Sequence, residues 1–189
     1  MSLDLSQFMD VDIQKIRLHA TPFALLALHP AYKLDMELVE RHYLILQKEL
    51  HPDRFAHKSA SESQTAQMMT SWINRAYTTL KDPVLRAEAL LRIAGCSITD
   101  EKTAGDSDLL SEIMEWRQKL QLLESEPAYK EFCHELQHSI KTCEENFHQA
   151  WETRNQQTLQ AHYLRLCYLI KTLKQAQQHT IKAAAVVGA

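Results

Sequence analysis

Apolar residues recur at alternating spacings of three and four along most of this chain, which is the period of an α-helix that buries one face. The longest such series is Tyr129, Cys133, Leu136, Ile140, Cys143, Phe147 and Trp151. The 189 residues include only three glycines and five prolines, against a usual share of roughly 7% and 5%. Turns must therefore be few and helices long, which predicts an all-α protein.

Residues that start and stop helices divide the N-terminal half into four predicted helices. Thr21 can cap the first helix and Asp35 the second. Ser61 and Gln64 form a candidate capping box for the third. Gly95 is suited to end the fourth, because glycine adopts the left-handed backbone that follows many helices. The predicted helices cover about 22–28, 36–50, 61–81 and 84–94.

The second and third of these helices should pair through apolar stripes. The first stripe is Val39, Tyr43, Leu46 and Leu50. The second is Met69, Ile73, Ala76 and Leu80, flanked by Trp72 and Tyr77. Antiparallel pairing of the two helices would hold their connecting loop, about residues 51–60, at the tip of the pair.

The C-terminal half predicts a separate helical bundle. Residues 96–106 hold one glycine and follow Gly95, and this stretch is interpreted as a linker. Three helices follow, at about 107–124, 127–153 and 157–178, and the short turn 154–156 makes the last two antiparallel neighbours. The first and last have the core stripes Leu109, Ile113, Trp116, Leu120, Leu123 and Leu159, Tyr163, Leu166, Ile170, Leu173.

The tripeptide His51-Pro52-Asp53 lies between the second and third predicted helices. Proline has no N–H and disfavours the helical conformation in the residue before it, and an aspartate can bond its own backbone just downstream. A turn is therefore expected, with an imidazole and a carboxylate on an exposed corner. Three residues are a weak signal, and a solvated turn without a function is the simplest interpretation; the helices on either side strengthen the signal.

In this context the chain resembles a J-domain, the module that stimulates the ATPase of seventy-kilodalton heat-shock chaperones. The wider pattern resembles the HscB family of J-domain co-chaperones of iron–sulfur cluster biogenesis. The resemblance covers about Thr21 to Gln178 and is strongest up to Gly95. It is carried by Phe23-Ala24-Leu25-Leu26, Tyr32-Lys33-Leu34-Asp35, His51-Pro52-Asp53-Arg54-Phe55, Asn74-Arg75-Ala76-Tyr77 and Arg86-Ala87-Glu88-Ala89-Leu90-Leu91.

The resemblance gives the predicted helices a domain organisation and a function. A partly disordered extension (1–20) would precede a J-domain (21–95), a linker (96–106), a three-helix bundle (107–180) and a flexible tail (181–189). The chain would stimulate an HscA-type chaperone and deliver an IscU-type scaffold protein to it. Chaperone binding would involve His51, Pro52, Asp53 and Arg54, with Arg41 and Lys48 on an exposed helix face that Glu37, Glu40 and Glu49 dilute.

Two short apolar rows lie beside the core stripes of the predicted bundle. Leu110 and Met114 form one row, and Leu164 and Tyr168 form the other. By periodicity alone they could widen the apolar arc of the bundle, pack on the J-domain, or bind a partner. The resemblance implies that Leu110, Met114, Glu115 and Tyr168 bind the scaffold, with Leu164 in the same row as Tyr168. This chain has Ser111, Gln118 and Leu122 where the family tends to have Met, Glu and Glu, which thins the acidic flank.

Cysteines and histidines give no metal-site pattern. The four cysteines form no C-x-x-C motif, so free thiols in a reducing compartment are expected. His134 and His138 would share one helix face, but two ligands make an incomplete site, so a solvated face is the expectation. We expect no metal and no cofactor.

Other classes of function fit less well. A net charge of −3 and the lack of a basic, aromatic-bearing stripe disfavour nucleic acid. No phosphate loop, G-x-S-x-G motif or pocket-forming pair of acid and base indicates an enzyme. No apolar run reaches membrane-spanning length, and residues 1–20 resemble neither a signal nor a transit peptide, so a bacterial-type cytoplasm is expected. A J-domain protein with a different client and a structural helical adaptor stay open as alternatives.

Overall fold

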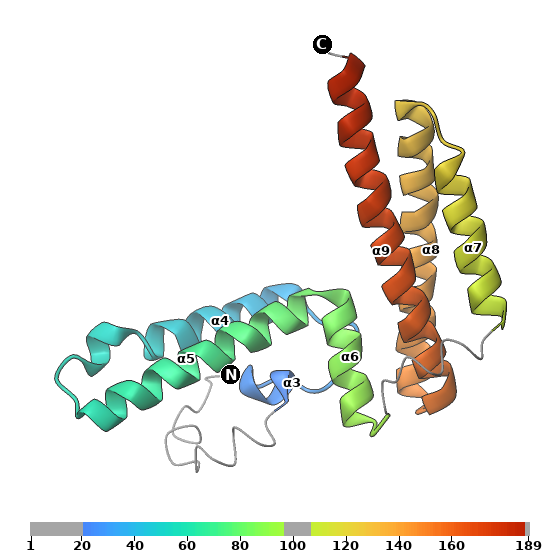
Figure 1. Cartoon of the computed structure of the whole chain (residues 1–189). Coiled ribbons are helices and arrows are strands. Elements are labelled where there is room, and N and C mark those ends of the chain that lie inside the picture. Colours follow the sequence, from blue (N-terminus) through green and yellow to red (C-terminus); the bar gives the residue numbers. More distant parts are fainter. Residues whose placement is uncertain (1–20, 97–106, 188–189) are drawn as a thin grey trace. The chain divides into compact units, whose positions relative to one another are not determined.

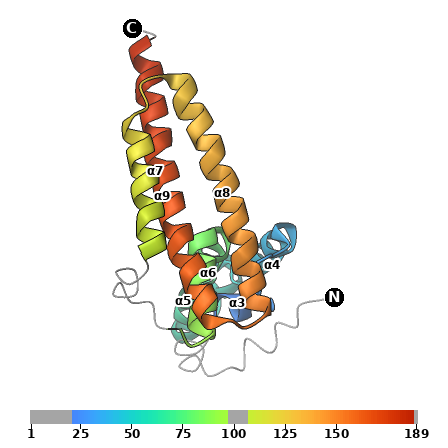
Figure 2. The same cartoon turned by 90° about the vertical axis from the view of Figure 1, so that its right-hand side faces the viewer.

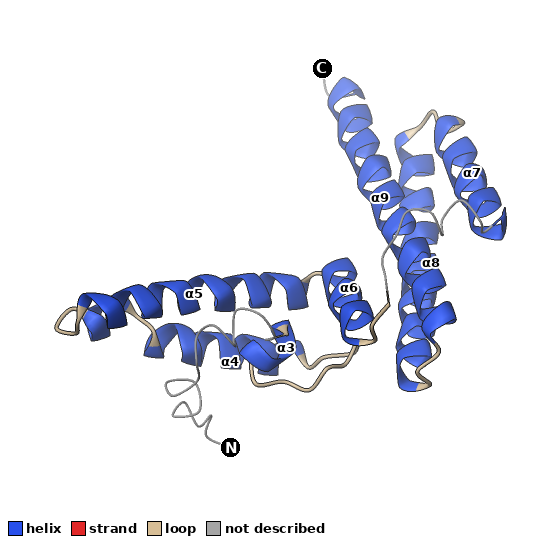
Figure 3. Cartoon of the chain, turned by 60° about the horizontal axis from the view of Figure 1, so that its bottom comes forward, coloured by secondary structure: helices blue, strands red, loops and turns tan. Residues whose placement is uncertain are grey.

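The computed structural model describes residues 21–96 and 107–187. The predicted extension 1–20, most of the predicted linker (97–106) and residues 188–189 lie outside this range. Every regular element in the described ranges is a helix (Figure 3), which confirms the all-α prediction. The chain divides into two compact units, Met1–Ile93 and Ala94–Ala189. None of the described helices is both long and apolar enough to cross a membrane.

The first unit is built around its longest helix, α5 (Ala60–Lys81). Helix α4 (Met36–Glu49) runs antiparallel beside it, and the short α3 (Pro22–Leu25) and α6 (Pro83–Ile93) also pack against it (Figure 1). A single 3-10 turn, η1 (Pro52–Phe55), lies in the connection between α4 and α5. The antiparallel pair with the connecting loop at its tip is therefore confirmed.

The predicted helix starts at Thr21 and Asp35 are confirmed. The Thr21 hydroxyl accepts a first-turn N–H at 3.1 Å, and the Asp35 carboxylate accepts two at 3.0 and 3.2 Å. Helix α3 ends at Leu25, earlier than predicted, because Ala27 adopts the left-handed region with φ 51°. Gly95 also lies in this region, with φ 70°, just after the end of α6. Its role as the stop is confirmed.

The predicted capping box of α5 is wrong by two residues. The N-cap is Ser59, whose hydroxyl oxygen accepts the N–H of Glu62 at 3.2 Å, while the Glu62 carboxylate accepts the Ser59 N–H at 2.9 Å. The Ser59 hydroxyl and then its N–H, both donating to the carboxylate, lower the pKa of Glu62. A carboxylate is a stronger acceptor than the amide of Gln64, so the earlier box wins and starts the helix at Ala60.

The predicted core of the first unit is largely confirmed. All four residues of the α5 stripe are buried, and Ala66 extends it. Of the α4 stripe, Val39 and Leu46 are buried, whereas Tyr43 and Leu50 are only half-buried. The ring of Tyr43 stacks on Tyr77 with centroids 4.0 Å apart, at the edge of the helix pair where its hydroxyl reaches a polar partner.

The second unit is an antiparallel three-helix bundle, as predicted (Figure 2). It consists of α7 (Ser107–Gln121), α8 (Glu126–Glu152) and α9 (Gln156–Val187), and both α7 and α8 pack on α9. Helix α7 ends three residues earlier than predicted. Helix α9 was predicted to end near Gln178, but it continues, so the expected flexible tail from residue 181 is helical through Val187.

The core stripes of the bundle are confirmed in part. In α8, Cys133, Leu136, Cys143 and Phe147 are buried as predicted, and Phe132 and Ala150 are buried in addition. In α9, the buried positions after Leu166 are Leu169, Thr172 and Ala176 instead of Ile170 and Leu173. Ile170 and Leu173 are half-buried, each one residue after a buried position. In α7 only Leu109 of the predicted stripe is fully buried.

The prediction of free thiols is confirmed for all four cysteines. Cys133 and Cys143 are buried, and Cys96 and Cys167 are half-buried. The Cys143 thiol contacts the carbonyl oxygen of His162 at 3.2 Å, and burial raises its pKa to about 12. It is therefore a protonated core side chain and not a reactive thiolate.

Candidate functional site

The loop between α4 and α5 is shaped by its own first three residues. His51 is the N-cap of η1, and its Nδ1 accepts the N–H of Asp53 at 3.4 Å. Pro52 occupies the first position of the turn, where its missing N–H costs nothing. The loop predicted for residues 51–60 thus contains one ordered turn, with the Asp53 side chain in that turn.

The Asp53 carboxylate is the most accessible charged group of this turn. Its side chain is 90% exposed, and Oδ2 lies 3.4 Å from Nδ1 of His51. Because Nδ1 of His51 accepts the Asp53 N–H, His51 is a close neighbour of the carboxylate rather than a cationic partner, and no lysine or arginine among the described residues pairs with Asp53. The carboxylate is therefore oriented by the loop and still free to accept a hydrogen bond from an external cation.

A polar cluster ties α4 to α5 behind this loop. The Asn74 side-chain oxygen accepts hydrogen bonds from Gln47 Nε2 at 2.6 Å and from the Tyr43 hydroxyl at 3.1 Å. The Tyr77 hydroxyl donates to the Glu40 carboxylate. These contacts fix the position of α4 along α5 and so position the loop. Sequence reasoning missed them, although residues 74 and 77 lie one turn apart in the quoted motif.

The charges next to the loop differ from the predicted arrangement. Arg54, which was predicted to contact the chaperone, forms an ion pair with Glu49. Of the glutamates expected to dilute the basic face of α4, Glu49 is paired with Arg54, whereas Glu40 accepts a hydrogen bond from the neutral Tyr77 hydroxyl and keeps its negative charge. Arg41 and Lys48 are exposed on α4 as predicted. The positive charge of this surface therefore rests on these two side chains.

The second candidate surface lies on α7 and α9 of the bundle. Met114 is 70% exposed, which is unusual for a large apolar side chain, and Leu110 and Glu115 are also exposed. Leu164 and Tyr168 on α9 are half-buried. Leu122, treated above only as a departure from the family, is 72% exposed just after the end of α7. Its neutral side chain marks the place where an acidic flank was expected.

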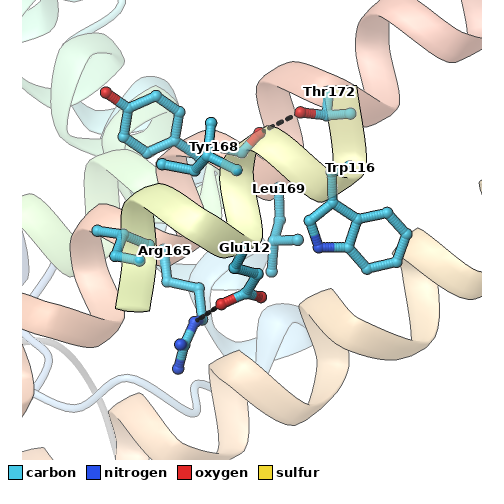
Figure 4. A pocket seen from close by; sticks show the side chains of 8 residues that line it. Glu112, Trp116, Arg165, Tyr168, Leu169 and Thr172 are labelled. Carbon is cyan, nitrogen blue, oxygen red and sulfur yellow. Dashed lines mark hydrogen bonds and ion pairs between the residues drawn. The ribbon is translucent and has the colours of Figure 1, made fainter. Parts of the chain in front are cut away.

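Tyr168 and several residues of α7 line the same shallow groove between α7 and α9 (Figure 4). An ion pair between Glu112 and Arg165, with Nε and Oε2 2.7 Å apart, ties the two helices together inside it. The groove has room for about one water molecule and so is no small-molecule site. Its lining residues are Leu109, Glu112, Ile113, Trp116, Arg165, Tyr168, Leu169 and Thr172.

The two histidines considered as metal ligands lie on the solvent-exposed surface of the bundle. His134 and His138 are both exposed on α8. In residues 21–96 and 107–187, no three histidine, cysteine, aspartate or glutamate side chains gather in a way that could hold a metal ion.

Comparisons with known proteins match both halves of this arrangement. Residues 105–177 match the family model described as the HSCB C-terminal oligomerisation domain. The chain is 39% identical over 106 residues to the co-chaperone protein HscB homolog of Mannheimia succiniciproducens, covering 55% of this chain and 61% of the relative. It is 43% identical over 99 residues to the homolog of Neisseria meningitidis serogroup A, covering 52% of this chain and 60% of the relative. The chain thus spans about 60% of the length of the curated relatives it matches.

Solved structures extend the similarity over most of the chain. The chaperone HscB from Vibrio cholerae superposes with a TM-score of 0.76 at 26% identity, covering 86% of this chain and 98% of that one. The human co-chaperone protein HscB gives a TM-score of 0.81 at 26% identity, covering 87% and 84%. The helix pair with its His-Pro-Asp loop, followed by a three-helix bundle, defines the class of J-domain proteins with a C-terminal bundle. Within that class, the chain is similar to proteins of the HscB family.

Proposed function

We propose that this chain is a co-chaperone of iron–sulfur cluster biogenesis. Its first unit stimulates the ATPase of an HscA-type seventy-kilodalton chaperone, and its bundle delivers an IscU-type scaffold protein to that chaperone. The match of residues 105–177 to the HSCB C-terminal family model and the similarity to relatives named co-chaperones support this proposal. ATP is hydrolysed by the partner, so the chain itself acts as an activator rather than an enzyme and uses no cofactor. The bacterial relatives favour a bacterial cytoplasm as the setting.

The exposed carboxylate of Asp53 is the observation that carries the chaperone half of the proposal. It accepts a charge-assisted hydrogen bond from a cation of the chaperone, while His51 and Pro52 hold the turn. Because His51 already binds the Asp53 N–H, little conformational freedom is lost when the loop docks. Arg41, Lys48 and the partly balanced Arg54 attract the acidic surface of the chaperone.

The exposed face of the bundle supports the second part of the proposal, which is the delivery of a scaffold protein. Leu110 and Met114 supply an apolar anchor, Glu115 supplies one negative charge beside it, and Tyr168 and Leu164 complete the surface from α9. The covalent link between the two units raises the effective concentration of the bound scaffold near the bound chaperone. A J-domain protein with a different client and a structural adaptor are the two alternatives.

Single-turnover ATP hydrolysis by an HscA-type chaperone tests the proposal. The four conditions are no addition, this protein, an IscU-type scaffold, and both together. The expected result is stimulation by the protein that rises further with the scaffold. Stimulation that ignores the scaffold would support a different client. Absence of stimulation in all four conditions would leave only the structural adaptor.

A further inference from the structure

Met114 is the most exposed methionine in the part of the chain that the structure describes. It is 70% exposed, whereas Met36 and Met68 are 37% and 38% exposed and Met69 is buried. Methionine is usually buried or packed against other apolar side chains, so this degree of exposure is unusual. A small oxidant dissolved in water therefore reaches the Met114 sulfur more easily than the sulfur of the other three.

The position of Met114 on α7 keeps its sulfur out of the packed helix contacts. Leu109 and Trp116 of α7 line the groove with α9, whereas Met114 does not. Among the described residues, nothing donates a hydrogen bond to the Met114 sulfur. The Met36 sulfur, by contrast, accepts a hydrogen bond from Arg86 Nη1 at 3.6 Å, which occupies one of its lone pairs. The lone pairs of the Met114 sulfur are therefore available for reaction.

Oxidation of a thioether changes the character of the whole side chain. When the sulfur attacks hydrogen peroxide, an S–O bond forms and the O–O bond breaks. The leaving oxygen takes the proton of the transferred oxygen and departs as water, so the sulfur loses two electrons and the peroxide gains them. The product, methionine sulfoxide, is polar. A flexible apolar side chain thus becomes one that is costly to bury against an apolar partner.

We propose that Met114 is a site of reversible oxidation by peroxides, and that its oxidation releases the scaffold protein from the bundle. This inference rests on the proposed function, in which Leu110 and Met114 supply the apolar anchor for the scaffold. The sulfoxide removes half of that anchor. The turn that carries Asp53 contains no sulfur, so the oxidised chain keeps its stimulation of the chaperone. Methionine sulfoxide reductases, one for each sulfoxide epimer, restore the thioether and with it scaffold binding.

The test treats the full-length protein with a graded series of hydrogen peroxide concentrations and then with dithiothreitol, which reverses sulfenic acids and disulfides but leaves sulfoxides in place. Peptide mass spectrometry follows each methionine, and calorimetry measures the affinity for an IscU-type scaffold. We expect Met114 to be oxidised several-fold faster than Met36 or Met68. Scaffold affinity should fall roughly tenfold when Met114 is fully oxidised, and it should return after treatment with both reductases.

Two matched variants assign the effect to one sulfur. Met114→Leu removes the sulfur and keeps an apolar side chain of similar size. Met68→Leu removes a half-exposed sulfur from the first unit. The scaffold affinity of each variant is compared with that of its own untreated sample, so a change in the starting affinity does not affect the comparison. Peroxide should leave the affinity of Met114→Leu unchanged and lower that of Met68→Leu as it does in the original protein.

Several outcomes would overturn the inference. One is oxidation of Met114 no faster than that of Met36 and Met68. A second is an equal loss of affinity in peroxide-treated Met114→Leu, which would assign the effect to another group, such as the half-buried Cys167. A third is full oxidation of Met114 with scaffold affinity unchanged, in which case the proposed function stands and this inference fails. If the untreated protein does not bind the scaffold, the proposed client function fails and the inference fails with it.

Discussion

The two candidate surfaces of this protein are built in opposite ways. The loop after α4 presents one carboxylate, 90% exposed, whose position is set by backbone contacts and helix caps. The α7–α9 face presents apolar side chains, including Met114 at 70% exposure, on top of a packed bundle. In the proposed function, recognition at the first surface depends on one group, and recognition at the second is spread over several.

This difference determines how each surface should respond to substitution. A directional charge-assisted hydrogen bond loses much of its strength when its single acceptor group is neutralised. Truncating one side chain of an apolar face removes part of the buried area, so it should weaken binding rather than abolish it. The loop should therefore be sensitive to single substitutions, and the bundle face should weaken step by step.

The largest expected effect is that of Asp53→Asn. The side chain keeps its size but loses its charge and exchanges one acceptor oxygen for an NH₂ donor, so the proposed contact to a chaperone cation loses its charge assistance. Charge-assisted hydrogen bonds contribute roughly 1.5–3 kcal/mol, which predicts a loss of chaperone stimulation of at least about tenfold. Circular dichroism should show unchanged helix content, because the side chain is exposed. Stimulation equal to that of the original protein would refute the role of the loop.

The next effect is that of Met114→Ala combined with Tyr168→Ala. Both substitutions remove apolar area from the proposed scaffold surface, and we expect scaffold affinity measured by calorimetry to fall about ten- to a hundredfold. Ile181→Ala is the matched control, because Ile181 on α9 is exposed to the same degree as Met114. Equal scaffold affinity in the double variant and the control would exclude this face as the client site.

A smaller effect is expected at the start of α5. Ser59→Ala removes the N-cap hydroxyl and should lower the free energy of unfolding by about 1 kcal/mol. Ser61→Ala alters the position that the sequence pattern favoured and should be nearly neutral. Urea denaturation of both variants checks the difference. A larger loss for Ser61→Ala would mean that the helix begins two residues later than described.

The smallest effect concerns pH and the bundle. Burial, followed by the neighbouring Arg165, lowers the pKa of His162 below its usual value. The unfolded chain therefore binds a proton at a pH where the folded chain does not. The free energy of unfolding should fall as the pH drops through about 6.5, and the fall should level off below the folded pKa. His162→Gln should flatten this dependence in urea titrations, whereas the exposed His134→Gln should not.

Helix starts were predictable wherever one polar residue stood alone before an apolar series. Thr21 and Asp35 are such cases, and both cap their helices as expected. The start of α5 was not predictable with the same certainty, because Ser59-x-x-Glu62 and Ser61-x-x-Gln64 overlap two residues apart. The choice between them depends on acceptor strength, which the pattern alone does not weigh.

The residues of the loop surface followed from a motif, but their partners did not. His51, Pro52 and Asp53 lie where the motif places them. The pairing of Arg54 with Glu49 was missed because long charged side chains choose among several neighbours only after the backbone is placed.

The central claim is that two separable surfaces serve two partners. The most direct measurement tests Asp53→Asn and the Met114→Ala, Tyr168→Ala variant in both assays: chaperone stimulation without scaffold, and scaffold binding without chaperone. The account predicts a crossed result, in which the first variant loses stimulation and keeps scaffold binding, and the second does the reverse. If either variant impaired both activities while remaining folded, the two surfaces would not be separable and the account would be wrong.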